Sequence, residues 1–219
     1  RAAQVVGCVI SNNCAARGSG SDASFVNCRI VGNYAHQTSC GLYRSNAYGC
    51  LFSKNINGGG QLCRFAYAVN GCTFADDNTT KEGTPITSFF PDKQFSRVEN
   101  TVFLGKIGNG FAATNCIFVT GEATGAITGD NRWVASKAAV GLDADFVPVK
   151  GGAAIDHGDD TLVSICVSQE GVDAAGVQRV YNGRGDIGAF EYDWRDDYKA
   201  DLGSGNFSVS YAAPTVVET

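Results

Sequence analysis

The chain has 219 residues, 44% of them hydrophobic, which is enough for a substantial buried core in one or two domains. Charged residues make up 18% and the formal net charge is −5, so the positive field that a nucleic-acid partner requires is missing. The sequence contains neither a long apolar run that would span a membrane nor a signal peptide, and we expect no direct membrane insertion. Because the chain starts at Arg1 and contains no Met, we expect it to be part of a longer polypeptide with further domains.

From the N-terminus to about residue 120 the chain repeats one pattern. Six segments align on a residue that is cysteine in all but one of them: Cys8, Cys28, Cys50, Cys72, Thr101 and Cys116. The first three intervals between these positions are nearly equal, the fourth is longer and the fifth is shorter. Because the last two intervals together equal two ordinary ones, the pattern indicates a repeat of about 22 residues with a long excursion over 78–95.

Three columns of this alignment each require a particular backbone. The residue before the aligned one is always Gly or Asn, the types that best tolerate a left-handed corner: Gly7, Asn27, Gly49, Gly71, Asn100 and Asn115. The residue two places after is Ile or Phe, the period of two of a strand with one buried face: Ile10, Ile30, Phe52, Phe74, Phe103 and Phe118. Five places after stand residues whose short polar side chains can bond to the backbone at a bend and stack as an asparagine ladder: Asn13, Asn33, Asn55 and Asp77.

Together the columns predict an all-β fold, a right-handed parallel β-helix over residues 1–192. Each strand should pair in parallel with its copy one repeat away, roughly 4.8 Å distant. A leucine-rich or ankyrin array does not fit, because neither the Leu spacing of the first nor the helix pair of the second occurs. Residues 193–219 are expected to be an irregular C-terminal extension or the start of a following β domain.

The cysteines are interpreted as a core ladder. Free Cys behaves as a small buried hydrophobe, so the aligned cysteines should be reduced thiols that stack inside the fold. Cys40 and Cys63 precede the markers of their repeats by nearly the same interval and should also be neighbours. A disulfide between these two remains open.

Three further motifs follow residue 120: LDADFVPV over 142–149, GGAAIDHGDD over 151–160 and NGRGDIGAFEYDW over 182–194. Their succession resembles the closing coils of bacterial β-helix surface proteins of the choice-of-anchor Q group, which is related to polysaccharide-lyase-like β-helices. The matching residues are Asp143, Phe146 and Val147, then Ala154, Ile155, Asp156 and Gly158, then Asp186 to Glu191. Ala144 and Ala153 depart from the family's usual Pro, and Gly152 from its usual Ser.

The resemblance implies a fold and an extracellular or cell-surface location more firmly than an activity, because one fold hosts many functions. It also gives Asp186 and Glu191 structural roles in the closing motif. Arg184, Gly185 and Asp186 spell the tripeptide that integrins read in other contexts, but here they overlap that motif.

Several residues are candidates for binding or chemistry. A polysaccharide lyase needs a basic residue to abstract a proton and carboxylates or Ca²⁺ to neutralise the sugar acid. Residues of these types in adjacent repeats are Arg44, Lys54, Arg64, Asp76 and Asp77, for which ordinary surface charge is the competing explanation. Asp156, His157, Asp159 and Asp160 form the chain's His–carboxylate cluster, and the closing motif favours a structural role for Asp156.

The sequence favours a non-catalytic, adhesin-like module that contacts glycans or another cell-surface partner. No catalytic residue, metal site or cofactor is predicted, since the sequence lacks a nucleophile elbow, a phosphate-binding Gly loop and a paired-His metal spacing. One alternative is a polysaccharide lyase or glycoside hydrolase that acts in a groove on one face. A second alternative is a filament subunit that stacks end to end through unpaired strand edges.

Overall fold

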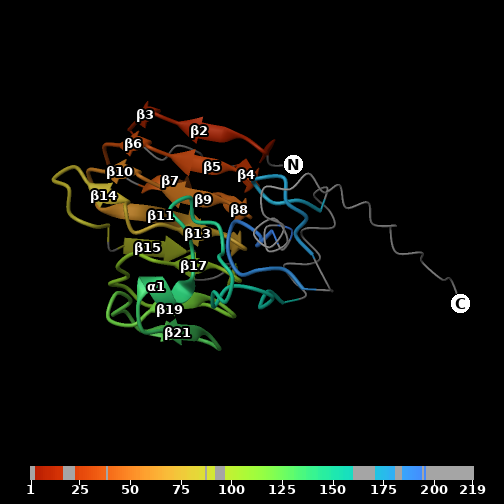
Figure 1. Ribbon diagram of the computed structural model, residues 1–219. Coiled ribbons are helices and arrows are strands. Elements are labelled where there is room, and N and C mark those ends of the chain that lie inside the picture. Colours follow the sequence, from red (N-terminus) through yellow and green to blue (C-terminus); the bar gives the residue numbers. More distant parts are fainter. Residues whose placement is uncertain are drawn as a thin grey trace, which may run out of the picture.

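The computed structural model describes residues 3–16, 23–37, 39–86, 88–91, 97–159, 171–180, 184–193 and 195. These residues form an all-β structure in which each pairing between two of the strands is parallel, and the one helix among them is α1 (Lys137–Val140). Ser136 caps the start of α1, and Gly141 ends it in a left-handed conformation. This arrangement is compatible with the parallel β-helix that the repeat predicts, and Figure 1 shows the strands stacked in chain order from β2 to β21.

The strands belong to four main sheets and one small one. Sheet A contains β1 (Ala3–Val6), β4 (Ala23–Val26), β8 (Asn46–Tyr48), β12 (Ala68–Asn70) and β16 (Arg97–Glu99). Sheet B contains β2 (Val9–Ser11), β5 (Arg29–Val31), β9 (Leu51–Ser53), β13 (Thr73–Phe74), β17 (Val102–Phe103), β19 (Ile117–Val119) and β21 (Arg132–Val134). Sheet C contains β3 (Cys14–Ala15), β6 (Tyr34–Ala35), β10 (Ile56–Asn57) and β14 (Thr79–Thr80), and sheet D contains β7 (Ser39–Tyr43), β11 (Gln61–Ala66) and β15 (Ser88–Pro91). The small sheet pairs β18 (Phe111–Ala112) with β20 (Ile127–Thr128).

The register of sheet B follows the repeat of the sequence. The residues that directly follow the aligned column pair with one another in a continuous row across the sheet: Val9, Arg29, Leu51, Thr73, Val102 and Ile117. The row continues to Arg132 on β21, a strand that sequence reasoning missed because Asn131 stands where a cysteine would mark the repeat.

The inward column of sheet B is an aromatic stack. The rings of Phe52, Phe74, Phe103 and Phe118 lie nearly parallel, with successive centroids 4.5, 5.2 and 5.0 Å apart. Trp133 continues the stack at 5.1 Å from Phe118 and is 48% exposed at the edge of the sheet. In-register pairing places identical rings one above another, so each repeat buries its neighbour's aromatic face.

The aligned column is more than a hydrophobic ladder. The backbone N of Cys28 donates to Sγ of Cys50 at 3.4 Å, and the same relation links Cys50 to Cys72 at 3.4 Å. In later repeats, Oγ1 of Thr101 and Oδ1 of Asn131 take over the accepting role, at 3.3 and 3.0 Å from the donor nitrogens. The column therefore selects a small side chain that can accept a hydrogen bond, which explains why Thr and Asn replace Cys.

All six corner residues before the aligned column have positive φ, between 48° and 64°. A second left-handed corner follows each strand of sheet B in the first repeats, at Asn12, Gly32 and Lys54. The sequence did not reveal this second corner, because Lys54 is not a residue type that signals positive φ.

The asparagine ladder joins Asn13, Asn33, Asn55 and Asn78. Each Oδ1 of the last three accepts from both the backbone N and Nδ2 of the Asn one repeat earlier, at 3.0 to 3.2 Å. The prediction that Asp77 continues the ladder was wrong. One extra residue lies between Cys72 and the bend, so Asn78 takes the position, and Asp77 accepts from Ser53 Oγ at 2.7 Å and Lys54 N at 2.8 Å.

Two other expectations need correction. Cys8 is exposed rather than part of a buried ladder, because it lies in the outermost described repeat and no described strand covers that side. The excursion over 78–95 is not entirely a loop, since β14 and β15 pair with sheets C and D and Phe89 is fully buried. Residues 81–85 are exposed, and 92–96 lie outside the described residues.

The C-terminal segment packs along the outside of sheet B. Figure 1 shows it running beside the stack, and the described part of 142–193 adds no strand to any sheet. Ile187 and Ala154 pack on the outward side chains of Val102 and Ile117, and Phe190 packs on Leu51. Outward residues of sheet B are thereby removed from solvent, so the sheet has an apolar layer on both faces.

We expect Asn55→Ala to lower the free energy of unfolding by about 3 kcal/mol, because its fully buried side chain makes four ladder hydrogen bonds and truncation orphans their partners. Asn46→Ala is the control: this half-buried side chain donates once, to Ser24 Oγ at 3.0 Å, and its loss should cost about 1 kcal/mol or less. Denaturant unfolding measures both. Equal losses of unfolding free energy in the two variants would contradict the prediction that the asparagine ladder stabilises the fold.

The thiols should divide sharply in reactivity. Cys8 and Cys14 are exposed, whereas the other described cysteines are buried, and burial raises the pKa of Cys40, Cys63 and Cys116 to about 12. An alkylating reagent at neutral pH should therefore modify Cys8 and Cys14 in the folded chain and the buried thiols only after denaturation. Peptide mass mapping reads the sites. A disulfide-linked peptide containing Cys40 and Cys63 would contradict this prediction.

Candidate functional site

A repeated hairpin builds the C-terminal segment. Residues 141–149 and 171–179 fold alike, and in each an Asp accepts two backbone hydrogen bonds: Asp143 Oδ1 from Asp145 N and Val147 N, and Asp173 Oδ1 from Ala175 N and Val177 N, all at 2.7 to 2.9 Å. The sequence signal was the similarity of GLDADFV, which begins at Gly141, to GVDAAGV, which begins at Gly171. Sequence reasoning missed it because both hairpins lie outside the cysteine column.

The second hairpin delivers Arg179 to a buried position. The residue is 1% exposed, and Nη1 donates to Glu191 Oε1 at 2.9 Å and to the Gly188 carbonyl at 3.1 Å. Nη2 donates to the Ala189 carbonyl at 2.8 Å. A buried guanidinium needs such partners, because an unpaired buried charge costs several kcal/mol.

Glu191 and Asp186 complete this network. Oε2 of Glu191 accepts from Asp186 N at 2.8 Å, and the two oxygens of Asp186 accept from Asp156 N at 2.8 Å and Tyr192 N at 2.6 Å. Burial raises the pKa of Asp186 to about 6 and also raises that of Glu191, while Arg179 opposes both shifts.

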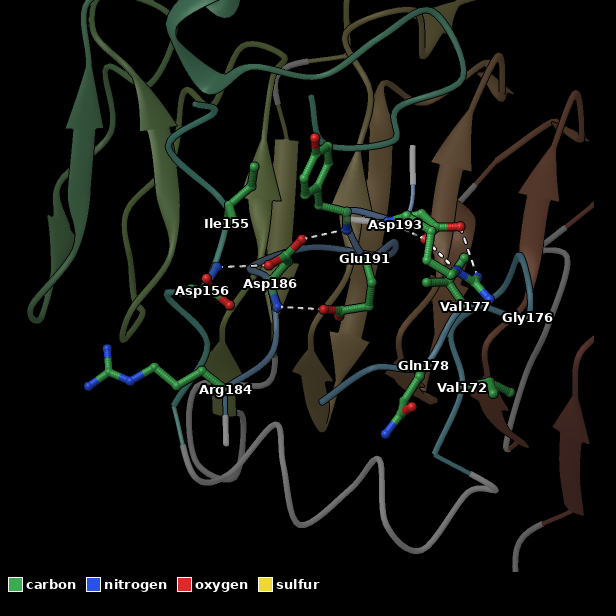
Figure 2. Close-up of a pocket in the computed structure, with 12 residues that line it drawn as sticks. Ile155, Asp156, Val172, Gly176, Val177, Gln178, Arg184, Asp186, Glu191 and Asp193 are labelled. Carbon is green, nitrogen blue, oxygen red and sulfur yellow. Dashed lines mark hydrogen bonds and ion pairs between the residues drawn. The ribbon is translucent and has the colours of Figure 1, made fainter. Parts of the chain in front are cut away.

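A cavity of about 340 Å³ adjoins this network, and Figure 2 shows the side chains that line it. Asp186 and Glu191 accept hydrogen bonds from backbone amides with their carboxylate oxygens, so these two residues join chain segments and neither is an uncommitted carboxylate that could serve as a base. Asp186 is 3% exposed, which hides the acidic end of the Arg184-Gly185-Asp186 tripeptide from an adhesion receptor.

The sequence candidates separate into two groups. Lys54, Asp76 and Asp77 lie just beyond the ends of β9 and β13. Asp77 is occupied by its bonds to Ser53 and Lys54, while Asp76 pairs with Lys137 of α1 at 2.5 Å. Lys137 also lies 3.9 Å from Glu122. Two carboxylates thus flank a lysine, but these side chains are 28 to 43% exposed, and the adjoining cavity is only about 10 Å³.

Arg64 lies on β11 of sheet D, and Arg44 directly follows β7 of the same sheet. Tyr43 pairs with Arg64 across β7 and β11, and Arg44 N donates to the Arg64 carbonyl at 3.2 Å. The Arg44 guanidinium lies 5.7 Å from the Tyr43 ring centroid, and that of Arg64 lies 5.0 Å from the Phe65 ring. The two rings meet edge to face at 6.3 Å. We call Tyr43, Arg44, Arg64 and Phe65 the arginine–aromatic surface.

This surface carries two positive charges. Among the residues that the structure describes, no carboxylate forms an ion pair with Arg44 or Arg64. Phe65 is 37% exposed, and the neighbouring Tyr67 is 39% exposed. Cation–π contact with the rings orders the two guanidinium groups and leaves their N–H donors available for an anionic ligand.

The His–carboxylate cluster is spread out rather than gathered. Asp159 Oδ1 accepts from Asn100 Nδ2 at 2.8 Å, and the His157 carbonyl accepts from Asn115 Nδ2 at 2.7 Å. Asp156 is exposed, and Asp160 lies outside the described residues. Within the described ranges, no group of three His, Cys, Asp or Glu side chains could hold a metal ion.

No family model, curated protein or solved structure matches this chain. The described part of the chain also contains no helix long and apolar enough to cross a membrane. Function is therefore inferred from the side chains described above.

Gly49 is predicted to make room for Arg179. A Cβ at Gly49 would lie 2.5 Å from Arg179 Nη2 and would also collide with Asn27 Oδ1, whereas a Cβ at Gly7 would meet nothing within 4 Å. Both glycines have nearly the same φ, 64° and 61°. Gly7→Ala should therefore cost about 1–2 kcal/mol for the left-handed backbone alone, and Gly49→Ala at least about 3 kcal/mol more, because it breaks a buried ion pair. Denaturant unfolding compares the two, and equal costs would contradict the prediction.

Proposed function

We propose that the chain is a right-handed parallel β-helix with coils of about 22 residues, the period of its sequence repeat. We further propose that it serves as a non-catalytic glycan-contacting module of an extracellular or cell-surface protein. The repeat, the left-handed corners and the all-parallel register support the fold. The three C-terminal motifs that resemble the choice-of-anchor Q group support the location.

The observation that carries the glycan assignment is the arginine–aromatic surface. Exposed aromatic rings offer apolar faces to sugar rings, and a guanidinium fork matches the geometry of a carboxylate or sulfate. Two such forks, one on β11 and one just beyond the end of the adjacent β7, suit a polymer with acidic groups along its length. Because the chain's net charge is −5, this local positive surface would select the ligand by short-range contact rather than by long-range attraction.

The lyase alternative has one observation in its favour, the Asp76–Lys137–Glu122 cluster. The exposure of the three side chains and the small cavity beside Asp76 weaken it, because a substrate-binding site is normally a concave pocket large enough to bury its ligand. Turnover assays on the same glycans separate the two functions.

Binding should depend on both sheet D arginines. Titration of the chain with polyuronate and sulfated glycans, followed by calorimetry, should show that Arg44→Gln with Arg64→Gln weakens binding about ten-fold or more, since each change removes a charge-assisted contact. Arg97→Gln on β16 is the matched control and should leave affinity unchanged. Unaltered binding in the double variant would overturn the assignment to this surface. If the chain depolymerises the glycan and Lys137→Met abolishes that activity, the enzymatic function replaces the proposed one.

A further inference from the structure

A separate hollow of about 530 Å³ lies where the last repeats meet the C-terminal segment. Its walls come from the corner at 114–115, from 130–132 at the start of β21, and from 157–159 with Arg184. Every side chain in this lining is polar or charged, apart from one glycine. Its volume is in the range of small-molecule sites, but its walls suit a polar ligand rather than an apolar one.

Two guanidinium groups, those of Arg132 and Arg184, line this hollow together with two carboxylates. Neither Arg132 nor Arg184 forms an ion pair with any residue in the part of the chain that is described. Figure 2 shows Arg184 extending away from Asp156 and Asp186, so it does not join the carboxylate network next to it. The carboxylates of the hollow are Asp130 and Asp159, and Asp159 bonds to Asn100.

His157 also lines the hollow, and both arginines influence its pKa. Its Nδ1 is buried and has no hydrogen-bond partner among the described residues, which is unusual for a polar atom in a folded protein. Burial lowers the pKa of His157, Arg132 and Arg184 lower it further, and Asp156 opposes them. The imidazole is therefore a sensor of any charge that enters the hollow, because a bound anion would offset the two arginines.

We propose that this hollow binds the oxyanion group of a small polar ligand, a carboxylate or a phosphate, with Arg132 and Arg184 as its counter-charges. Both arginine side chains present forked N–H donors that match such a group. The side-chain amides of Asn115 and Asn131 already form hydrogen bonds within the protein, so the arginines are the main donors that the hollow offers to a ligand. Asp130 and Asp159 balance the two arginines in formal charge, so the forked geometry of the guanidinium groups, rather than a net positive field, would select an oxyanion. The site is independent of sheet D, since it shares no residue with the arginine–aromatic surface.

The chain's two histidines make the test specific. Proton NMR resolves the ring C–H signals of His36 and His157, and His36 follows β6 in sheet C, which contributes no residue to the lining of the hollow. Titration with inorganic phosphate or with glucuronate should shift the His157 signal to saturation, raise its pKa, and leave His36 unchanged. Glucose, a neutral sugar, should shift neither. Saturation by phosphate alone would identify a free phosphate site, and saturation by glucuronate alone would identify a sugar-acid site.

Variants decide whether the arginines hold the anion. Arg132→Gln and Arg184→Gln should each weaken the anion-dependent shift of His157 about ten-fold, while Arg97→Gln should not change it. The proposal is overturned if neither anion shifts His157 at millimolar concentration, if His36 responds equally, or if the double variant binds as well as the original chain. Because Arg44 and Arg64 are untouched, failure here leaves the glycan test on sheet D unaffected.

Discussion

The structure depends on hydrogen bonding between equivalent side chains of successive repeats. In the asparagine ladder each Oδ1 accepts two bonds from the repeat before it, and in the cysteine column a sulfur or oxygen accepts a backbone N–H. Such bonds form only when repeats lie in register, so the ladders fix the register that parallel pairing alone leaves free. The aromatic stack inside sheet B follows from the same alignment.

This register also serves the C-terminal segment. The corner residues must adopt positive φ, and three of them are Asn rather than Gly. Asn27 donates to the Val172 carbonyl at 2.7 Å, and Asn100 and Asn115 reach Asp159 and the His157 carbonyl. At Gly49 the missing side chain leaves room for Arg179. The corner residues before the aligned column therefore form the left-handed turn of each repeat and also bind the C-terminal segment that covers sheet B.

Positive charge is distributed over distinct faces by this architecture. Arg179 is buried and neutralised by Glu191, so it contributes to stability and not to recognition. Arg44 and Arg64 lie at the ends and on the strands of sheet D, and Arg132 and Arg184 line the hollow at the far end of the stack. None of the four forms an ion pair among the described residues. Ligand binding on this fold therefore depends on charged side chains that form no ion pair within the described structure, since a fold does not by itself imply a function.

The sequence by itself determined the repeat, the left-handed corners and the inward column, because each depends on local backbone preference recurring at a fixed spacing. It could not show that Asn78 displaces Asp77 from the ladder, that Asn131 continues the cysteine column, or that 141–149 and 171–179 form twin hairpins. These depend on which groups meet across repeats. Only the tertiary structure separated Arg44 and Arg64 from Asp76 and Asp77, buried Arg179, and brought Arg132 beside the hollow with Arg184, because contacts between segments far apart in sequence leave no periodic signal in the chain.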